Sequence, residues 1–121
     1  MLTGKFTRQL RLTSPSDYKE VFNDPRRFKS TDQIFLVLAR KNSLPHARLG
    51  LAISAKHLKK SVDRNRVKRQ VRESFRINQE KLAGLDIVVL SRIDTLRAEN
   101  NNIRKSLDRH WVKMTEQCKN F

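Results

Sequence analysis

A basic segment with helical periodicity, flanked by two apolar strand-like segments, constrains this chain more than any other feature. The 21 residues from Lys56 to Arg76 hold nine Lys or Arg side chains and two acidic ones, Asp63 and Glu73. At 100° per residue, one stripe of this segment holds Val67, Val71, Ser74, Phe75 and Asn78. The pattern predicts an amphipathic helix that packs on a sheet through this stripe and keeps its charges in water.

The charged residues of the predicted helix divide into distinct surfaces. One broad polar face holds Asn65, Lys68, Arg69, Arg72 and Arg76, whereas Arg64 and Arg66 lie on opposite flanks of the helix start. Lys56, Lys59 and Lys60 lead into that start, where the helix dipole is already positive. Because this placement costs helix stability, it favours a functional explanation. Arginine binds phosphate in a bidentate manner, and asparagine both donates and accepts hydrogen bonds, as a base edge requires.

The charge of the whole chain indicates a polyanionic partner. With 27 Lys and Arg against 12 Asp and Glu, the formal net charge is +15. Nucleic acid is the first candidate and an acidic membrane surface the second, and charge alone does not separate them. The structural alternative is a solvated helix face on which Glu73 bridges Arg69 and Arg76, but two acidic residues do not neutralise nine bases.

Length and cysteine content indicate one cytoplasmic domain. The 121 residues suit a single domain, 1–121, with a basic N-terminal arm at 1–13 and a short C-terminal tail at 115–121. Cys118 is the only cysteine, which excludes an internal disulfide and fits a reducing compartment. The longest apolar run, Ile34 to Ala39, is too short to span a bilayer, and charged residues interrupt any signal-peptide core.

The sequence shows no pattern typical of a protein active site or metal centre. His46, His57 and His110 lack ligand-like spacing, and there is no zinc motif or glycine-rich phosphate loop. A nuclease with a histidine pair is the sharper alternative. Nothing in the sequence brings His57 and His110 together, so surface or partly buried histidines are favoured. Asp86 and Asp94 are interpreted as turn-capping residues rather than metal ligands.

Apolar periodicity predicts an α+β fold. Helices are expected from the cap Ser14 to Asn23, across the basic segment with Ser61 or Asp63 near its start, and from about 101 to about 117. The last of these should bury the stripe Ile103, Leu107, Trp111 and Met114. Strands are expected at 28–31, 33–40, 48–54 and 86–91. The order α-β-β-β-α-β-α predicts a two-layer sandwich, with a mixed sheet of three to four strands that helices cover on one face.

Two details of the strand arrangement follow from loop lengths and glycine. The segments 33–40 and 48–54 are close enough in the chain to pair as antiparallel neighbours. If 48–54 and 86–91 are parallel, the general rule predicts a right-handed crossover through the basic helix. Gly50 has no side chain, so it suits a bulge or the close approach of another group.

The chain resembles the protein subunit of bacterial ribonuclease P. The resemblance is carried by Lys59-Lys-Ser-Val-Asp-Arg-Asn-Arg-Val-Lys-Arg-Gln-Val-Arg-Glu-Ser-Phe-Arg76, by Arg48-Leu-Gly-Leu-Ala-Ile-Ser-Ala-Lys56 before it and by Asp86-Ile-Val-Val-Leu after it. Phe6, Leu10-Arg-Leu12 and Tyr18-Lys-Glu-Val-Phe22 complete the pattern, which covers about residues 5–114. The resemblance implies a left-handed β-α-β crossover, in place of the right-handed expectation.

The same resemblance implies a function. Members of this family bind a large catalytic RNA, and the two together remove the 5′ leader from precursor tRNA as an endoribonuclease. The RNA carries the active site and binds the Mg²⁺ ions, so the protein is expected to have no active site and to bind no cofactor alone. The resemblance further implies that the protein broadens substrate use and lowers the Mg²⁺ requirement. The implied partners are the catalytic RNA and precursor tRNA, with no membrane and no obligatory protein partner.

Charge pattern and resemblance together assign candidate site residues. The RNA-binding residues are Lys56, Lys59, Lys60, Arg64, Asn65, Arg66, Lys68, Arg69, Arg72 and Arg76. The 5′-leader-binding residues are Tyr18, Phe22, Ser54, Lys56 and Arg92. Two aromatic rings four residues apart on a helix can stack on unpaired bases, although ordinary core packing is the alternative.

Other classes of protein fit the sequence less well. A structural RNA-binding protein, such as a ribosomal protein, is the second hypothesis, because a basic helix in an α/β fold suits that class too. A sequence-specific DNA-binding protein ranks third, because a strand and not a helix leads into the basic helix. A membrane-surface helix ranks last, since its narrow apolar stripe is needed for the core.

Overall fold

The computed structural model describes residues 11–12 and 14–119, so most of the expected arm at 1–13 and the last two residues lie outside the described part. The elements are α1 (Pro15–Asn23), β1 (Phe28–Thr31), β2 (Phe35–Lys41), β3 (Arg48–Ala52), α2 (Ser61–Asn78), β4 (Leu85–Ser91) and α3 (Asn100–Lys119). This order confirms the predicted α+β fold. Because α3 continues to Lys119, most of the segment expected as a tail is helical.

The strands form one mixed sheet in the order β1-β2-β4-β3. β2 is antiparallel to both β1 and β4, and β3 is parallel to β4. The expected antiparallel pairing of 33–40 with 48–54 is therefore wrong, because β4 lies between them. The reason is visible in the burial of β4: Leu85 to Val89 are all buried, so this strand takes the interior of the sheet. β3, which contains half-buried residues, lies at the edge.

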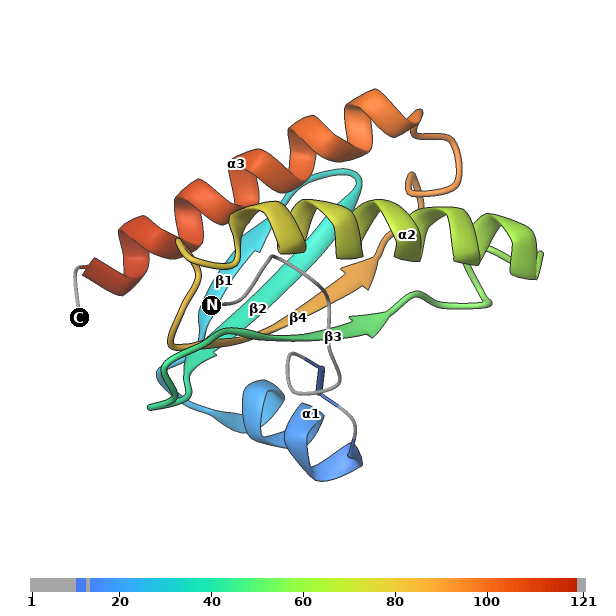
Figure 1. Cartoon of the computed structure of the whole chain (residues 1–121). Coiled ribbons are helices and arrows are strands. Elements are labelled where there is room, and N and C mark those ends of the chain that lie inside the picture. The colour runs from blue at the N-terminus through green and yellow to red at the C-terminus, as the bar shows by residue number, and fades with distance from the viewer. Residues whose placement is uncertain (1–10, 13, 120–121) are drawn as a thin grey trace.

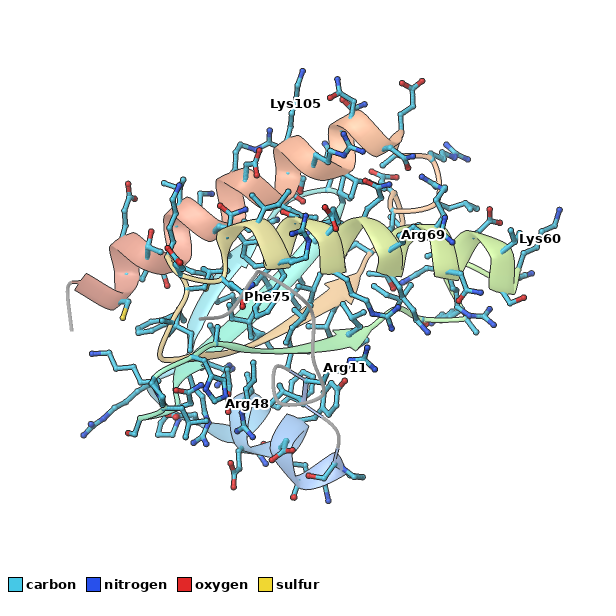
Figure 2. The ribbon with its side chains drawn as sticks, in the orientation of Figure 1. Arg11, Arg48, Lys60, Arg69, Phe75 and Lys105 are labelled. Atoms are coloured by element: carbon cyan, nitrogen blue, oxygen red, sulfur yellow. The ribbon has the colours of Figure 1, made fainter. Side chains whose placement is uncertain are left out.

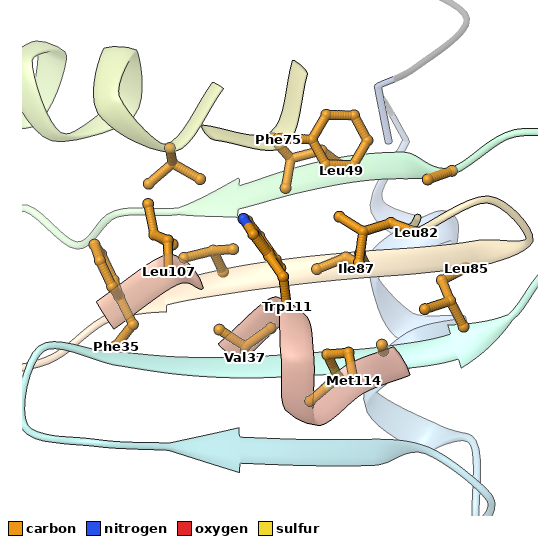
Figure 3. Packing of buried hydrophobic residues seen from close by; sticks show 14 of the residues in the cluster. Phe35, Val37, Leu49, Phe75, Leu82, Leu85, Ile87, Leu107, Trp111 and Met114 are labelled. Carbon is orange, nitrogen blue, oxygen red and sulfur yellow. The ribbon is translucent and has the colours of Figure 1, made fainter. Parts of the chain in front are cut away.

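The connection from β3 through α2 to β4 is left-handed. Viewed from the side of α2 with both strands pointing upward, β4 lies to the left of β3 (Figures 1 and 3). The family resemblance implied this hand, whereas the general rule for β-α-β units predicted the opposite one.

The main core lies between the sheet and the two long helices. Figure 3 shows Phe75 of α2 and Trp111 of α3 pointing toward the strands. All four residues expected in the stripe of α3, Ile103, Leu107, Trp111 and Met114, are buried. Ser74 belongs to the buried stripe of α2, and its hydroxyl accepts a hydrogen bond of 2.8 Å from Trp111 Nε1. A polar residue is therefore tolerated in this stripe because it joins the two helices.

The opposite face of the sheet carries α1. Val21 packs there with Leu12, Leu38 and Val88 in a second, smaller apolar cluster. Helices therefore lie on both faces, with α2 and α3 on one and α1 on the other (Figure 1), so the expectation that helices cover one face alone is wrong. α1 has nine residues, so it covers only part of its face.

Helix and turn chemistry follows the sequence in two places and departs from it in one. Ser14 caps α1, and its hydroxyl accepts from Asp17 N in a capping box. Gly84 has a φ of 87°, as the chain turns into β4. α2 begins at Ser61 with Asp63 in its first turn, as expected, but its N-cap is Lys60, which forms no side-chain cap bond.

Candidate RNA interface

The predicted basic helix crosses the sheet with its charges facing solvent. Val67, Val71 and Phe75 are completely buried, whereas Asn65, Arg69 and Arg72 are exposed. Figure 2 shows Lys60 at the beginning of α2 and Arg69 further along it. The outward residues Asn65, Arg69, Arg72, Glu73 and Arg76 surround a shallow hollow of about 320 Å³. Four of the five residues inferred for the broad polar face, all except Lys68, therefore line one hollow.

Glu73 interrupts this positive surface at one point. Its carboxylate pairs with Arg76, with 2.5 Å between Oε1 and Nη2. The hydrogen bond from Arg76 lowers the pKa of Glu73, so the glutamate stays ionised. No ion pair between Glu73 and Arg69 is seen in the described part of the chain, so Arg69 keeps its charge directed at solvent.

Arg64 and Arg66 point away from each other, as the helical wheel predicted, and each holds a different loop. Arg64 Nη1 donates to the carbonyls of Leu58 and Lys59, at 2.9 Å each. This contact fixes the loop that carries the lysines into α2. Because a guanidinium has five N–H donors, Arg64 retains donors for a phosphate.

Arg66 makes the corresponding contact on the other side of the helix. Its Nη1 donates to Ala98 O at 3.2 Å and to Asn100 Oδ1 at 2.8 Å, and its Nη2 donates to Leu96 O at 3.4 Å. Arg66 thus joins the middle of the sequence to the loop between β4 and α3. Sequence reasoning assigned both arginines to RNA and missed these internal partners, which have no local signal.

The face of the sheet that carries α1 consists of three cross-strand rows. The register places Arg40, Asp86 and Arg48 in one row, Leu38, Val88 and Gly50 in the next, and Leu36, Leu90 and Ala52 in the third. The middle row is covered by α1 and by Leu12. The third row is only half-buried, so it forms an apolar strip beside α1, and we call it the open row.

α1 directs its aromatic side chains toward the open row. Val21 faces the sheet, and the carboxylate of Glu20, on one flank of the helix, accepts from Arg40 of the first row in an ion pair. At 100° per residue, Tyr18 and Phe22 both lie on the opposite flank, which faces the open row. Phe22 is 36% exposed, a large fraction for a phenylalanine. The open row and this flank make a surface on which unpaired bases can stack.

Polar residues end the open row where β3 and β4 stop. Ser54 N donates to Ser91 Oγ at 2.8 Å, which ties the two strand ends together. Lys56 is exposed in the turn that follows. Arg92 Nη1 donates to Thr31 Oγ1 at 2.7 Å and to Asp32 O at 2.6 Å, so this arginine lies across the end of the sheet. The five predicted leader-binding residues thus lie at α1 and at the strand ends.

A buried ion network fixes the position of α1. Asp86 is fully buried. Its two carboxylate oxygens accept hydrogen bonds from Arg48, from Nε at 2.8 Å and from Nη2 at 2.7 Å. The hydrogen bonds with Asp86 raise the pKa of Arg48. Arg40 links Asp86 to α1: its Nε lies 3.8 Å from Asp86 Oδ2, and its Nη2 lies 2.7 Å from Glu20 Oε2. Asp86 is therefore an ion-pair residue, and the interpretation as a turn cap is wrong.

Ser30, His110 and Asp32 lie in a line that resembles a catalytic triad. Ser30 Oγ is 2.6 Å from His110 Nδ1, and His110 Nε2 is 3.2 Å from Asp32 Oδ2. Both Ser30 and His110 are buried, with exposed fractions of 4% and 2%, so no substrate reaches the hydroxyl. Burial lowers the pKa of His110. The expectation of a surface or partly buried histidine is wrong for His110, which joins α3 to the β1–β2 turn.

Two further features of the described residues bear on function. No cluster of three or more His, Cys, Asp or Glu side chains in residues 11–12 and 14–119 has the arrangement of a metal site. None of the helices in this part of the chain is both long and apolar enough to cross a membrane.

The fold and these surfaces define a class of small α+β proteins. A basic helix crosses one face of a mixed sheet, and a half-covered apolar row lies on the other. The chain belongs to the ribonuclease P protein family, whose model matches residues 6–115. Its partner is therefore the RNA of ribonuclease P, and the complex is a ribonuclease that processes tRNA.

Individual relatives agree with this membership. The ribonuclease P protein component of Nitrosococcus oceani is 46% identical over 113 residues, which cover 93% of each chain. That of Marinobacter nauticus is 48% identical over 112 residues, covering 93% of this chain and 83% of the relative.

Solved structures show the same fold. The RNase P protein of Staphylococcus aureus superimposes with a TM-score of 0.79 at 25% identity, over 88% of this chain and 97% of the other. The Thermotoga maritima protein gives a TM-score of 0.72 at 32% identity, over 84% and 94% of the two chains.

Proposed function

We propose that this protein binds the catalytic RNA of ribonuclease P through α2 and holds the single-stranded 5′ leader of precursor tRNA beside α1. The RNA performs the cleavage and binds most of the Mg²⁺. The observation that carries this proposal is the separation of two surfaces by one sheet. The charged face of α2 lies on one side of the sheet, and the aromatic flank of α1 lies on the other.

The α2 surface suits a folded RNA. Its residues Arg69, Arg72 and Asn65 are exposed and lie on a rigid helix whose apolar stripe is buried. Guanidinium groups bind phosphates through paired hydrogen bonds, and each neutralised phosphate releases counterions. Arg64 and Arg66 add one contact on each flank, at loops that they also fix.

The surface beside α1 suits single-stranded RNA. Phe22 and Tyr18 offer aromatic rings beside the apolar open row, and Arg92, Lys56 and Ser54 offer polar groups at its end. Bases stack on aromatic side chains with about 1–3 kcal/mol per base, with little dependence on sequence. This mode suits leaders of differing sequence, and it explains how the protein broadens substrate use.

The lower Mg²⁺ requirement follows from charge. A protein with a formal net charge of +15 brings fixed cations to the place where the catalytic RNA and the precursor approach each other. These cations replace part of the screening that Mg²⁺ otherwise supplies. This screening by fixed cations does not depend on a metal site among the described residues of the protein.

Reconstitution tests the proposal. Purified protein is mixed with a bacterial ribonuclease P RNA and a precursor tRNA, and cleavage is followed as Mg²⁺ is varied. We expect RNA plus protein to cleave at low Mg²⁺, RNA alone to need more Mg²⁺, and protein alone to be inactive. Cleavage by protein free of RNA would overturn the assignment of catalysis to the RNA. A protein that left the Mg²⁺ dependence unchanged would instead favour a structural RNA-binding role.

A further inference from the structure

The outer edge of β3 is capped by single contacts, from the backbone before α1 and from the Tyr18 side chain, and not by another strand. β3 is the last strand of the sheet order, so its outward backbone groups need other partners. Leu12 N donates to Leu49 O at 3.0 Å. The hydroxyl of Tyr18 accepts from Leu51 N at 3.1 Å and donates to Leu51 O at 3.4 Å. Because these caps are short, space remains beside the edge.

That space is a small hollow, which we call the edge hollow. It has a volume of about 150 Å³ and is lined by Arg11, Leu12, Tyr18, Leu49, Leu51, Lys68 and Arg72. Three separate parts of the chain therefore meet there: the segment before α1, the β3 edge and α2. Figure 2 shows Arg11 beside β3, between the levels of α2 and α1.

The lining of the edge hollow is selective for an anion. Three of its seven lining residues are cationic and none is acidic. By contrast, the hollow on the outer face of α2 includes Glu73, and the two that α3 borders include Asp94 and Asp108. Lys68 and Arg72 are one helical turn apart, so their side chains approach the same point. The volume is well below the roughly 300–1,000 Å³ of small-molecule pockets, so it suits one phosphate group.

The position of Tyr18 indicates which phosphate the edge hollow binds. Its ring packs against Gly50 in the middle row, on the same flank of α1 as Phe22, and its hydroxyl bonds to Leu51 at the wall of the edge hollow. The edge hollow therefore continues the surface to which we assign the leader. On its other side it is bounded by Lys68 and Arg72 of α2.

We propose that the edge hollow binds one phosphodiester of the 5′ leader, through Arg11, Lys68 and Arg72, where the strand passes Tyr18 toward α2. This inference rests on the proposed leader binding and adds to it a defined subsite and a new contact, Arg11. The phosphate is held from two directions: Arg11 contacts it from the segment before α1, and Lys68 and Arg72 contact it from α2.

Neutral phosphates in the leader test the inference. Holoenzyme is reconstituted, and its affinity is measured for precursor tRNAs that carry a single methylphosphonate at successive leader positions. With wild-type protein we expect one position to lose affinity by roughly tenfold, as expected for a hydrogen-bonded charge. In Arg11→Gln and in Lys68→Gln protein, unmodified precursor should bind correspondingly more weakly, and that position should no longer respond. Lys68 lies within a packed helix, so Lys68→Gln tests the site even if Arg11→Gln alters the chain before α1.

Controls separate the sources of failure. Lys113→Gln removes an exposed charge from α3 and should keep the wild-type response at the sensitive position. The leader subsite would be overturned if the Arg11→Gln and Lys68→Gln variants lost as much affinity for mature tRNA as for precursor tRNA. It would also be overturned if they bound the catalytic RNA more weakly while the response to the leader methylphosphonate stayed unchanged. A position that still responds fully in both variants would overturn it too. If wild-type protein supports no cleavage, the proposed function fails; if it does and the variants behave as wild type, only the edge hollow fails.

Discussion

Tyr18 is the residue on which the proposed leader surface depends most. Its ring packs against Gly50, its hydroxyl is bonded to Leu51 across 33 residues, it packs against the same apolar cluster as the open row, and it lines the edge hollow. The sequence identified Tyr18 as a stacking candidate and Gly50 as a point of close approach. It gave no sign that the two meet, because contacts between distant segments leave no local pattern.

A Gly50→Ala substitution should displace Tyr18. A Cβ atom at position 50 would lie 2.7 Å from Tyr18 Cε1 and 2.8 Å from Cζ, closer than real contacts allow. We expect a loss of about 1–3 kcal/mol in the free energy of unfolding, typical of overpacking, together with weaker binding of precursor tRNA. Urea unfolding of the protein measures the first effect, and affinity of the holoenzyme measures the second.

The Tyr18→Ala background provides the control for this prediction. Without the ring, the methyl group at position 50 has room, so Gly50→Ala should then cost little. An equal cost in both backgrounds would show that Gly50 is needed for a reason other than the approach of Tyr18.

At the scale of elements, α3 is held to the β1–β2 turn by a polar cluster. Asp32 receives Ser106 Oγ at 2.6 Å and backbone N–H groups of Ile34 and Phe35 at 2.8 and 2.9 Å. Burial alone would raise the pKa of Asp32, but these hydrogen bonds and the nearby His110 outweigh burial and lower it to about 2. An ordinary carboxylate pKa in the unfolded chain, 3.8, is therefore higher than the folded value.

This cluster should make stability depend on pH in acid. Between pH 3.8 and about 2 the unfolded chain binds a proton at Asp32 that the folded chain does not. The contribution of Asp32 is thus complete above pH 3.8 and is lost as the pH falls through about 2. In Asp32→Asn protein, proton uptake on unfolding in this window should fall by up to about one. Urea unfolding at a series of pH values measures it.

Asp108→Asn is the matched control, because it removes an exposed carboxylate from α3. An acid transition that Asp32→Asn leaves unchanged would show that the cluster does not hold α3. Because burial also lowers the pKa of His110, that residue adds a second loss of stability as the pH falls below its ordinary value of 6.5.

The elements themselves were largely predictable, and their pairing was not. The buried stripes of α2 and α3 were predicted correctly because the spacing of apolar residues in the sequence has the 3.6-residue period of an α-helix. The pairing of β2 with β3 was wrong because a short loop favours a hairpin, and the burial of β4 on both faces overrides it. Arg66 illustrates the same limit: its partners Leu96 and Ala98 lie some 30 residues away, in a loop without periodicity.

On the scale of the whole molecule, one sheet separates two kinds of surface. The positive face of α2 and the open row beside α1 lie on opposite sides, and the edge hollow at β3 lies between them. Sequence alone placed the charge correctly, because nine Lys or Arg side chains lie within 21 residues. The open row could not be predicted, since it arises from register between strands and from the small area that α1 covers. The assignment of each surface to one RNA is our proposal, and it rests on the family and on this geometry together.

The affinity of the reconstituted holoenzyme for precursor tRNA, relative to mature tRNA, tests this division most directly. Phe22→Ala is compared with wild type, and Val112→Ala, which truncates an exposed apolar side chain on α3, is the control. We expect Phe22→Ala to lower the ratio of the two affinities by roughly tenfold, because only the precursor has a leader to stack on the ring. Val112→Ala should leave the ratio unchanged. If Phe22→Ala weakens precursor and mature tRNA equally, or weakens neither, the leader does not lie beside α1.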